Sequence, residues 1–205
     1  PRGTVVATEL KFGLPDGDFP PLKRKLPSGR TVNFRGSVDR VEKTAAGTLV
    51  VVDYKTGKLD SYKQLSPDNP ILGGSQLQLP LYAAAANSYL GQDVNETHAS
   101  YWFTSDSQKW ATKGYLVTYD VLDAFDEAID VIVDGIEGGL FPPKPAPSSS
   151  KWTGVGKCVF CDPDALGTRE IDEKWKTLSL LDSLHPYIQL RGEDAIASDE
   201  QGDDE

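Results

Sequence analysis

The chain is poor in the residues that build disulfide frameworks and membrane spans. Its 205 residues include only two cysteines, Cys158 and Cys161, which are too few and too close together for the framework of a small secreted protein. No apolar run approaches the roughly 18 residues of a transmembrane helix, and the first residues carry no signal-peptide pattern. We therefore expect a cytoplasmic protein with no membrane partner.

Positive charge is also scarce. Lys and Arg number 21 against 31 Asp and Glu, so the formal net charge is −10, which argues against nucleic acid as a partner. The acids are unevenly placed, because residues 193–205 hold seven of them and no Lys or Arg. Without those seven the net charge rises from −10 to −3, which leaves room for a local basic groove. We expect residues 191–205 to be a disordered acidic tail.

The rest of the chain, residues 1–190, fits one folded domain with a real core. A hydrophobic content of 39% and a charged content of 25% are typical of soluble globular proteins. The expected strands are residues 4–12, 31–42, 48–55, 97–105 and 113–118, and the expected helices are residues 75–86, 120–137 and 170–181. Ser75 and Asp120 are the expected N-caps of the first two helices. This order predicts an α/β sandwich with a mixed sheet.

One strand ends in residues that carry chemistry. Val50, Val51 and Val52 run into Asp53, and Lys55 follows two positions later. Side chains two apart on a strand share a face, so the carboxylate and the ammonium point the same way. The carboxylate can hold a hard cation, and the lysine can steady an attacking water or a developing negative charge. Taken alone, however, Asp-x-Lys is more often an edge-strand salt bridge.

Other acids and polar residues gather near this strand end. Residues 45–47 form a short turn, and the resulting hairpin places Asp39 beside Asp53. Two adjacent carboxylates repel each other unless a cation lies between them, which favours a metal site over the salt bridge. Gln78 and Tyr82 share one face of the expected helix. Glu9 is a solvated strand acid or a further neighbour of this site.

These residues also carry a family resemblance. The three segments are Gly36-Ser37-Val38-Asp39-Arg40, Asp53-Tyr54-Lys55-Thr56-Gly57 and Gln78-Leu79-Pro80-Leu81-Tyr82. In this order they resemble the motifs of RecB-like nucleases of the PD-(D/E)XK superfamily, which are Gly-x-(Val/Ile)-Asp, Asp-x-Lys-(Thr/Ser)-Gly and Gln-x-x-x-Tyr. Members are often the C-terminal nuclease domains of helicase–nuclease proteins. The resemblance implies a restriction-endonuclease-like sandwich, with a central mixed β-sheet flanked by helices.

The resemblance also implies roles for single residues. Asp39 and Asp53 would be metal ligands together with the backbone carbonyl of Tyr54, and the ion would be Mg²⁺ or Mn²⁺. Lys55 would orient or activate the water that attacks the phosphodiester. Gln78 and Tyr82 would contact DNA near the scissile phosphate or support the site. The implied partners are DNA and a helicase domain or subunit of the same machine.

The chain departs from the family pattern in two places. Many members carry a His or Glu on a helix before the first strand, whereas Pro1 lies almost at that strand, so we expect a nuclease domain over residues 1–190 that lacks an N-terminal helix. Cys158 and Cys161 resemble the cysteine pair of members with an iron–sulfur cluster, but Gly167 stands at the third cysteine position. Two thiolates cannot hold such a cluster, so we expect none. Zinc shared with another region or two inert thiols remain open.

Three functions follow as alternatives. The first is a magnesium-dependent deoxyribonuclease that acts in double-strand-break repair and recombination, with exonuclease action favoured over endonuclease action. The second is a catalytically inactive nuclease fold that works as a DNA-binding or scaffold module. The third is an unrelated α/β protein with accidental motifs, which would require Asp39 and Asp53 to lie far apart.

Overall fold

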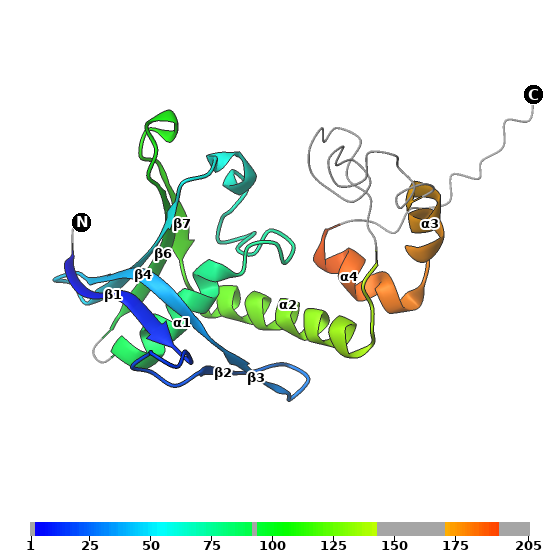
Figure 1. Ribbon diagram of the computed structural model, residues 1–205, viewed down its shortest axis with the longest axis horizontal. Helices are drawn as coiled ribbons and strands as arrows, with labels where there is room; N and C mark the ends of the chain where they lie inside the picture. The colour runs from blue at the N-terminus through cyan, green and yellow to red at the C-terminus, as the bar shows by residue number, and fades with distance from the viewer. Residues whose placement is uncertain (1–2, 92–93, 143–170, 193–205) are drawn as a thin grey trace, which may run out of the picture. The chain divides into compact units, whose positions relative to one another are not determined.

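The computed structural model describes residues 3–91, 94–142 and 171–192 (Figure 1). The chain divides into two compact units, Pro1–Asp130 and Val131–Glu205. The strands are β1 (Thr4–Phe12), β2 (Leu22–Lys25), β3 (Thr31–Phe34), β4 (Gly36–Lys43), β5 (Thr48–Lys55), β6 (Glu96–Phe103) and β7 (Thr112–Leu116). The helices are α1 (Gln78–Leu90), α2 (Tyr119–Glu137), α3 (Ile171–Leu178) and α4 (His185–Leu190), with short 3-10 turns η1 (Leu59–Tyr62), η2 (Asp106–Gln108) and η3 (Asp182–Leu184).

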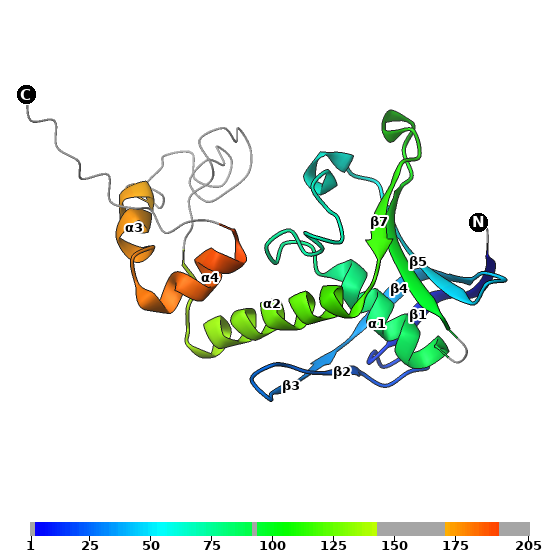
Figure 2. The same ribbon diagram turned by 180° about the vertical axis from the view of Figure 1, so that it is seen from behind.

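The first unit is built on a five-stranded sheet in the order β1-β4-β5-β6-β7. Neighbouring strands are antiparallel except β5 and β6, which are parallel because α1 connects them. Helix α1 contacts β4, β5 and β6 and covers one face of the sheet (Figure 2). A mixed sheet flanked by helices confirms the predicted fold class.

Alternating apolar residues explain why β5 is a central strand. Leu49 and Val51 are fully buried on the face that meets α1, and on β6 Ala99 and Tyr101 extend the same layer. The turn between β4 and β5 closes as expected: Gly47 has a φ of 82°, and its amide donates to the Thr44 carbonyl at 3.0 Å. This turn fixes the register that brings the ends of the two strands together.

Helix α1 begins three residues later than the sequence predicted. Its N-cap is Leu77, and Ser75 instead donates its hydroxyl to the Leu72 carbonyl at 2.8 Å, so the expected Ser75 cap is wrong. The later start puts Pro80 in the first turn, where a missing N–H costs nothing. The alanine run that follows, Ala83 to Ala86, is buried and lets the helix approach the sheet closely.

The expected strand over residues 31–42 is two strands in two sheets. The chain leaves β3 at Arg35 and begins β4 at Gly36, where an added Cβ would lie only 3.1 Å from the Phe12 ring. β3 pairs with β2, a strand that the sequence did not predict, and this ribbon is visible in Figure 1. Arg24 of β2 forms a bidentate ion pair with Asp126 of α2, which anchors the ribbon to the helix.

The remaining boundaries shift by a few residues. The strand expected at 97–105 ends at Phe103, and the one expected at 113–118 ends at Leu116. α2 begins at Tyr119, and the side chain that accepts a first-turn amide is Thr118 rather than Asp120. Its end after Glu137 is confirmed, because the Gly138 amide donates to the Asp134 carbonyl at 2.8 Å.

The second unit has a small apolar cluster of its own. Trp175 of α3 packs with Leu184 and Ile188, and partly buried side chains surround these three. The helix expected over residues 170–181 ends at Leu178, and α4 was not predicted. Cys158, Cys161 and the acidic tail lie outside the described residues. Among the described helices, none is long and apolar enough to cross a membrane.

Candidate active site

The two motif aspartates lie at the same level of adjacent strands. β4 and β5 are paired up to Arg40 and Val52, and the next position on each strand is Asp39 and Asp53. Asp39 Oδ2 accepts a hydrogen bond of 2.8 Å from the Tyr54 amide, which ties the first carboxylate to the strand that carries the second. The structure therefore brings together the pair that the sequence hairpin predicted.

Asp53 is a buried carboxylate in an unfavourable setting. Its side chain belongs to a residue that is 4% exposed, and burial raises the pKa of Asp53 above its usual value. Lys55 lowers this pKa, whereas the charge of Asp39 raises it further, and the net direction is upward. Neighbouring charges thus do not fully compensate the carboxylate for its lost hydration.

One oxygen of this carboxylate has a charge partner but no hydrogen-bond donor. Asp53 Oδ2 lies 2.7 Å from Lys55 Nζ, yet no donor in the described part of the chain meets it with hydrogen-bond angles. The short distance is an ion pair whose direction leaves lone pairs of Oδ2 free. A buried oxygen in this condition is costly unless something else coordinates it.

The third motif completes a chain of polar contacts. Lys55 Nζ donates to Gln78 Oε1 at 2.7 Å, and Gln78 Nε2 donates to the Tyr82 hydroxyl at 3.4 Å. Gln78 and Tyr82 lie one helical turn apart on α1, as expected. Burial raises the pKa of Tyr82, and the charges of Asp53 and Asp39 add to this effect. The phenol is therefore protonated at neutral pH.

The site also contains residues that sequence reasoning missed. The ring of Tyr101 lies on β6 with its centroid 4.9 Å from Lys55 Nζ, and the Tyr101 hydroxyl donates to Gln76 Oε1 at 3.3 Å. Tyr101 is paired with Asp53 across the parallel strands. No spacing signal could have identified it, because the register of β6 against β5 depends on the length of the connection through α1.

The comparisons agree with the geometry. A family model described as the PD-(D/E)XK nuclease superfamily matches residues 1–191. The chain belongs to this superfamily. Its mixed sheet is accordingly a restriction-endonuclease-like fold, and the sequence-based recognition is confirmed.

Relatives of this PD-(D/E)XK chain are much longer proteins, each described as the B-type subunit of an ATP-dependent helicase/deoxyribonuclease. The one from Clostridium tetani is 45% identical over 82 residues, which is 38% of this chain and 7% of the relative. The one from Geobacillus kaustophilus is 43% identical over 94 residues, 44% of this chain and 8% of the relative. A third, from Clostridium botulinum strain Langeland, is 38% identical over 87 residues, 41% and 7% respectively. The matched region is thus a small part of each relative, and these matches support the RecB-like, helicase-associated recognition.

The donor atoms fit a hard divalent cation. The carboxylates of Asp39 and Asp53, with the expected main-chain carbonyl of Tyr54, would form an all-oxygen set of the kind that Mg²⁺ and Mn²⁺ prefer. The free lone pairs of Asp53 Oδ2 are what such an ion would satisfy. No group of three or more His, Cys, Asp or Glu within residues 3–91, 94–142 and 171–192 could hold a metal ion. Water and substrate phosphate would have to complete the coordination.

Glu9 lies beside the superfamily motif residues without joining them. On β1 it falls between Thr8 and Leu10, which pair with Arg40 and Val38, and its φ of 49° is unusual for a residue other than glycine. Its Oε2 accepts a hydrogen bond of 3.1 Å from the Ser37 hydroxyl. Glu9 is exposed, as the solvated-acid interpretation expected.

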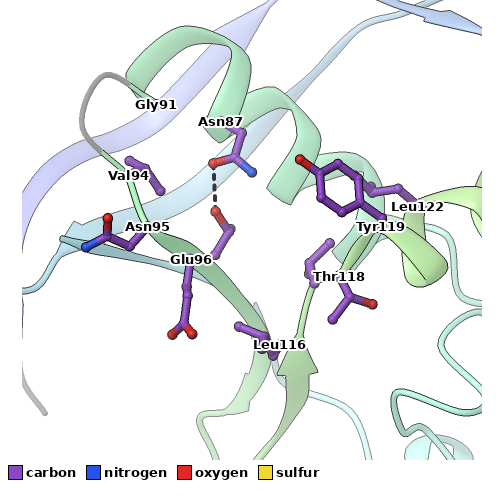
Figure 3. Close-up of a pocket in the computed structure, with 11 residues that line it drawn as sticks. Asn87, Gly91, Val94, Asn95, Glu96, Leu116, Thr118, Tyr119 and Leu122 are labelled. Carbon is purple, nitrogen blue, oxygen red and sulfur yellow. Dashed lines mark hydrogen bonds between the residues drawn. The ribbon is translucent and has the colours of Figure 1, made fainter. Parts of the chain in front are cut away.

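A separate hollow lies at the other end of the sheet. It has a volume of about 450 Å³, and Glu96, at the start of β6, and Tyr119, at the start of α2, line it (Figure 3). Asn87 faces it from α1 and accepts a hydrogen bond of 2.7 Å from Thr97. Lys55 pairs with Phe103 at the opposite end of β6, so this hollow is distinct from the superfamily motifs.

Proposed function

We propose that this chain is a metal-dependent deoxyribonuclease domain that hydrolyses phosphodiester bonds in DNA, within a helicase–nuclease that acts in double-strand-break repair. The observation that carries the proposal is the buried Asp53 oxygen, which has no hydrogen-bond donor and lies between Asp39 on the next strand and the Lys55 ammonium. The family supports nuclease chemistry, and the helicase/deoxyribonuclease names of the relatives support the setting. Mg²⁺ or Mn²⁺ is the proposed ion.

Each polar residue has a defined task in this reaction. A bound divalent cation would polarise the phosphate and lower the pKa of the attacking water. Asp39 and Asp53 would supply the negative charge that holds the cation. Lys55, with its charge fixed between Asp53 and Gln78, would donate a hydrogen bond to the attacking water or to the developing negative charge on the phosphate. The water oxygen forms the new bond to phosphorus as the bond to one ester oxygen breaks.

Two residues on α1 face the same place and would contact the DNA. Gln78 uses its carbonyl oxygen on Lys55, and its amide nitrogen donates to Tyr82. Tyr82 is half-buried and keeps its proton, so its hydroxyl can donate to a phosphate oxygen. These contacts would place the scissile phosphate next to Asp53 and Lys55. Exonuclease action and a cytoplasmic location stay predictions.

One observation favours a second candidate. The described residues supply two acidic side chains to the site and no third acidic or histidine ligand. A site this sparse binds cations weakly, so the chain could serve as a DNA-binding or scaffold module without cleavage. Retention of both aspartates and of Lys55 in one buried network argues for the active enzyme.

The test is a cleavage assay on linear DNA with Mg²⁺ or Mn²⁺. Asp53→Ala and Lys55→Ala are compared with Asp60→Ala, which removes an exposed acid that pairs with Lys63 away from the motifs. We expect cleavage that requires the metal, is lost in the first two variants and is kept in the third. Cleavage that survives Asp53→Ala would refute the site. DNA binding without any cleavage by the unmodified chain would favour the scaffold function.

A further inference from the structure

The Lys55 ammonium is held from three sides. Asp53 Oδ2 and Gln78 Oε1 each lie 2.7 Å from Nζ, on β5 and α1 respectively. The third side is the ring of Tyr101, whose centroid is 4.9 Å away. Tyr101 is fully buried, so this contact is made out of water. A cation over an aromatic face is attracted to its negative side, more strongly when the pair is desolvated.

Neighbouring residues fix the Tyr101 ring at its face and at its tip. The ring of Tyr62, in η1, meets it edge-on with centroids 4.8 Å apart and an interplanar angle of 62°. At the tip, the Tyr101 hydroxyl donates to Gln76 Oε1, and the Gln76 amide donates to the Ile71 carbonyl at 2.9 Å. A ring held in this way forms a rigid wall, whereas the lysine stem is flexible.

We propose that Tyr101 is a positioning residue for Lys55, and that its ring face keeps the ammonium aimed at the point shared by Asp53 and Gln78. This inference rests on the proposed nuclease function. Without the ring, Lys55 keeps two polar partners but gains room to swing away from them. Its loss would therefore slow the chemical step while leaving DNA binding intact, because misplacement of a catalytic group weakens the transition state more than the ground state.

The chain offers a matched control. Phe103 lies on the same strand and the same face as Tyr101, is also fully buried, and also meets Tyr62 edge-on, at 5.3 Å. It is not the residue that faces Lys55. Phe103→Leu therefore removes a comparable buried ring from the same layer without touching the proposed contact.

The first test measures kcat and KM for DNA cleavage in the full chain. We expect Tyr101→Leu to lower kcat roughly 10-fold, which corresponds to a desolvated cation–π contact, with KM unchanged. Tyr101→Phe keeps the ring and should restore kcat. Phe103→Leu should lower the melting temperature while keeping kcat. Equal losses of kcat in Tyr101→Leu and Phe103→Leu, or in Tyr101→Leu and Tyr101→Phe, would overturn the proposal.

Two further measurements do not depend on a large cavity or on turnover. Phenylalanines with one, two or three ring fluorines at position 101 keep the shape of the ring while weakening its negative face, so kcat should fall stepwise. A flat series would overturn the proposal. In NMR spectra the ε-methylene protons of Lys55 should be shifted upfield by the ring, and the shift should vanish in Tyr101→Leu but persist in Tyr101→Phe. An absent shift in the unmodified chain would also overturn it.

Failure of this inference differs from failure of the proposed function. If Asp53→Ala abolishes cleavage while Tyr101→Leu keeps the full kcat, only the positioning role is wrong. If Asp53→Ala and Lys55→Ala both keep cleavage, the proposed site is wrong, and the NMR shift still reports on the contact itself.

Discussion

Replacing Asp53 by asparagine should stabilise the metal-free protein while abolishing its activity. Burial raises the pKa of Asp53, and this effect, with the charge of Asp39, outweighs the attraction of Lys55. The folded state therefore disfavours the charged carboxylate. An asparagine amide at this position would carry no charge to desolvate or to repel Asp39. The variant costs Lys55 one partner, but the Gln78 contact remains.

The expected gain is modest and depends on pH in a defined direction. Removal of an unfavourable active-site charge typically adds about 0.5–2 kcal/mol to the free energy of unfolding, or roughly 2–6 °C for a domain of this size. Because the folded pKa of Asp53 lies above its unfolded value, the penalty in the unmodified chain is present above the folded pKa. It disappears below the unfolded pKa, so the advantage of Asp53→Asn should shrink as the pH falls through this range.

Metal should reverse the order of stability. A cation that binds only the folded state adds about 2.7 kcal/mol at 100 times its Kd, and Asp53→Asn should lose most of this gain. Thermal melts of both proteins, with chelator and then with Mg²⁺, measure the effect. Asp126→Asn is the matched control, since Asp126 is a buried acid paired with Arg24 and should lower the melting temperature in both conditions. Equal stabilisation of the unmodified chain and Asp53→Asn by Mg²⁺ would refute the reasoning, as would a lower melting temperature of Asp53→Asn with chelator.

Three shorter predictions concern the same sheet. Lys55→Ala should lower the cleavage rate about 100- to 1,000-fold, as loss of a donor to a developing charge does, and an unchanged rate would exclude Lys55. Gln78→Ala removes a hydrogen bond to a charged group and should slow single-turnover cleavage roughly 10-fold. Gly114→Ala would place its Cβ 2.1 Å from the Ala99 carbonyl oxygen, so urea unfolding should show a loss of about 3 kcal/mol.

The sequence predicted the parts of the site that depend on local pattern. Alternation along β5 put Asp53 and Lys55 on one face, and a short turn with Gly47 put Asp39 opposite Asp53. Helical spacing put Gln78 and Tyr82 on one face of α1, and they are hydrogen-bonded. These features need only the periods of strands and helices and the length of one turn. The catalytic and metal-binding roles of the residues stay predictions.

Features that depend on tertiary pairing were missed. Residues 31–42 read as one β-branched strand, because nothing in the pattern shows that Thr31 to Phe34 pair with β2 while the rest pairs with β1 and β5. The start of α1 was placed at Ser75 because serine is a common cap, although the chain uses that hydroxyl in the preceding turn. Propensity identified the elements, whereas long-range contacts set their ends.

The geometry of Lys55 shows why the site needs the folded sheet. Its three neighbours come from β5, α1 and β6, which are distant in sequence and adjacent only when the parallel pair has formed. All of these elements belong to the unit Pro1–Asp130. The charged atoms are then buried where the metal-free fold gains little from them, as the raised pKa of Asp53 indicates. Such an arrangement persists at the expense of stability when the missing interaction is supplied by a ligand, and here the free oxygen of Asp53 indicates a cation.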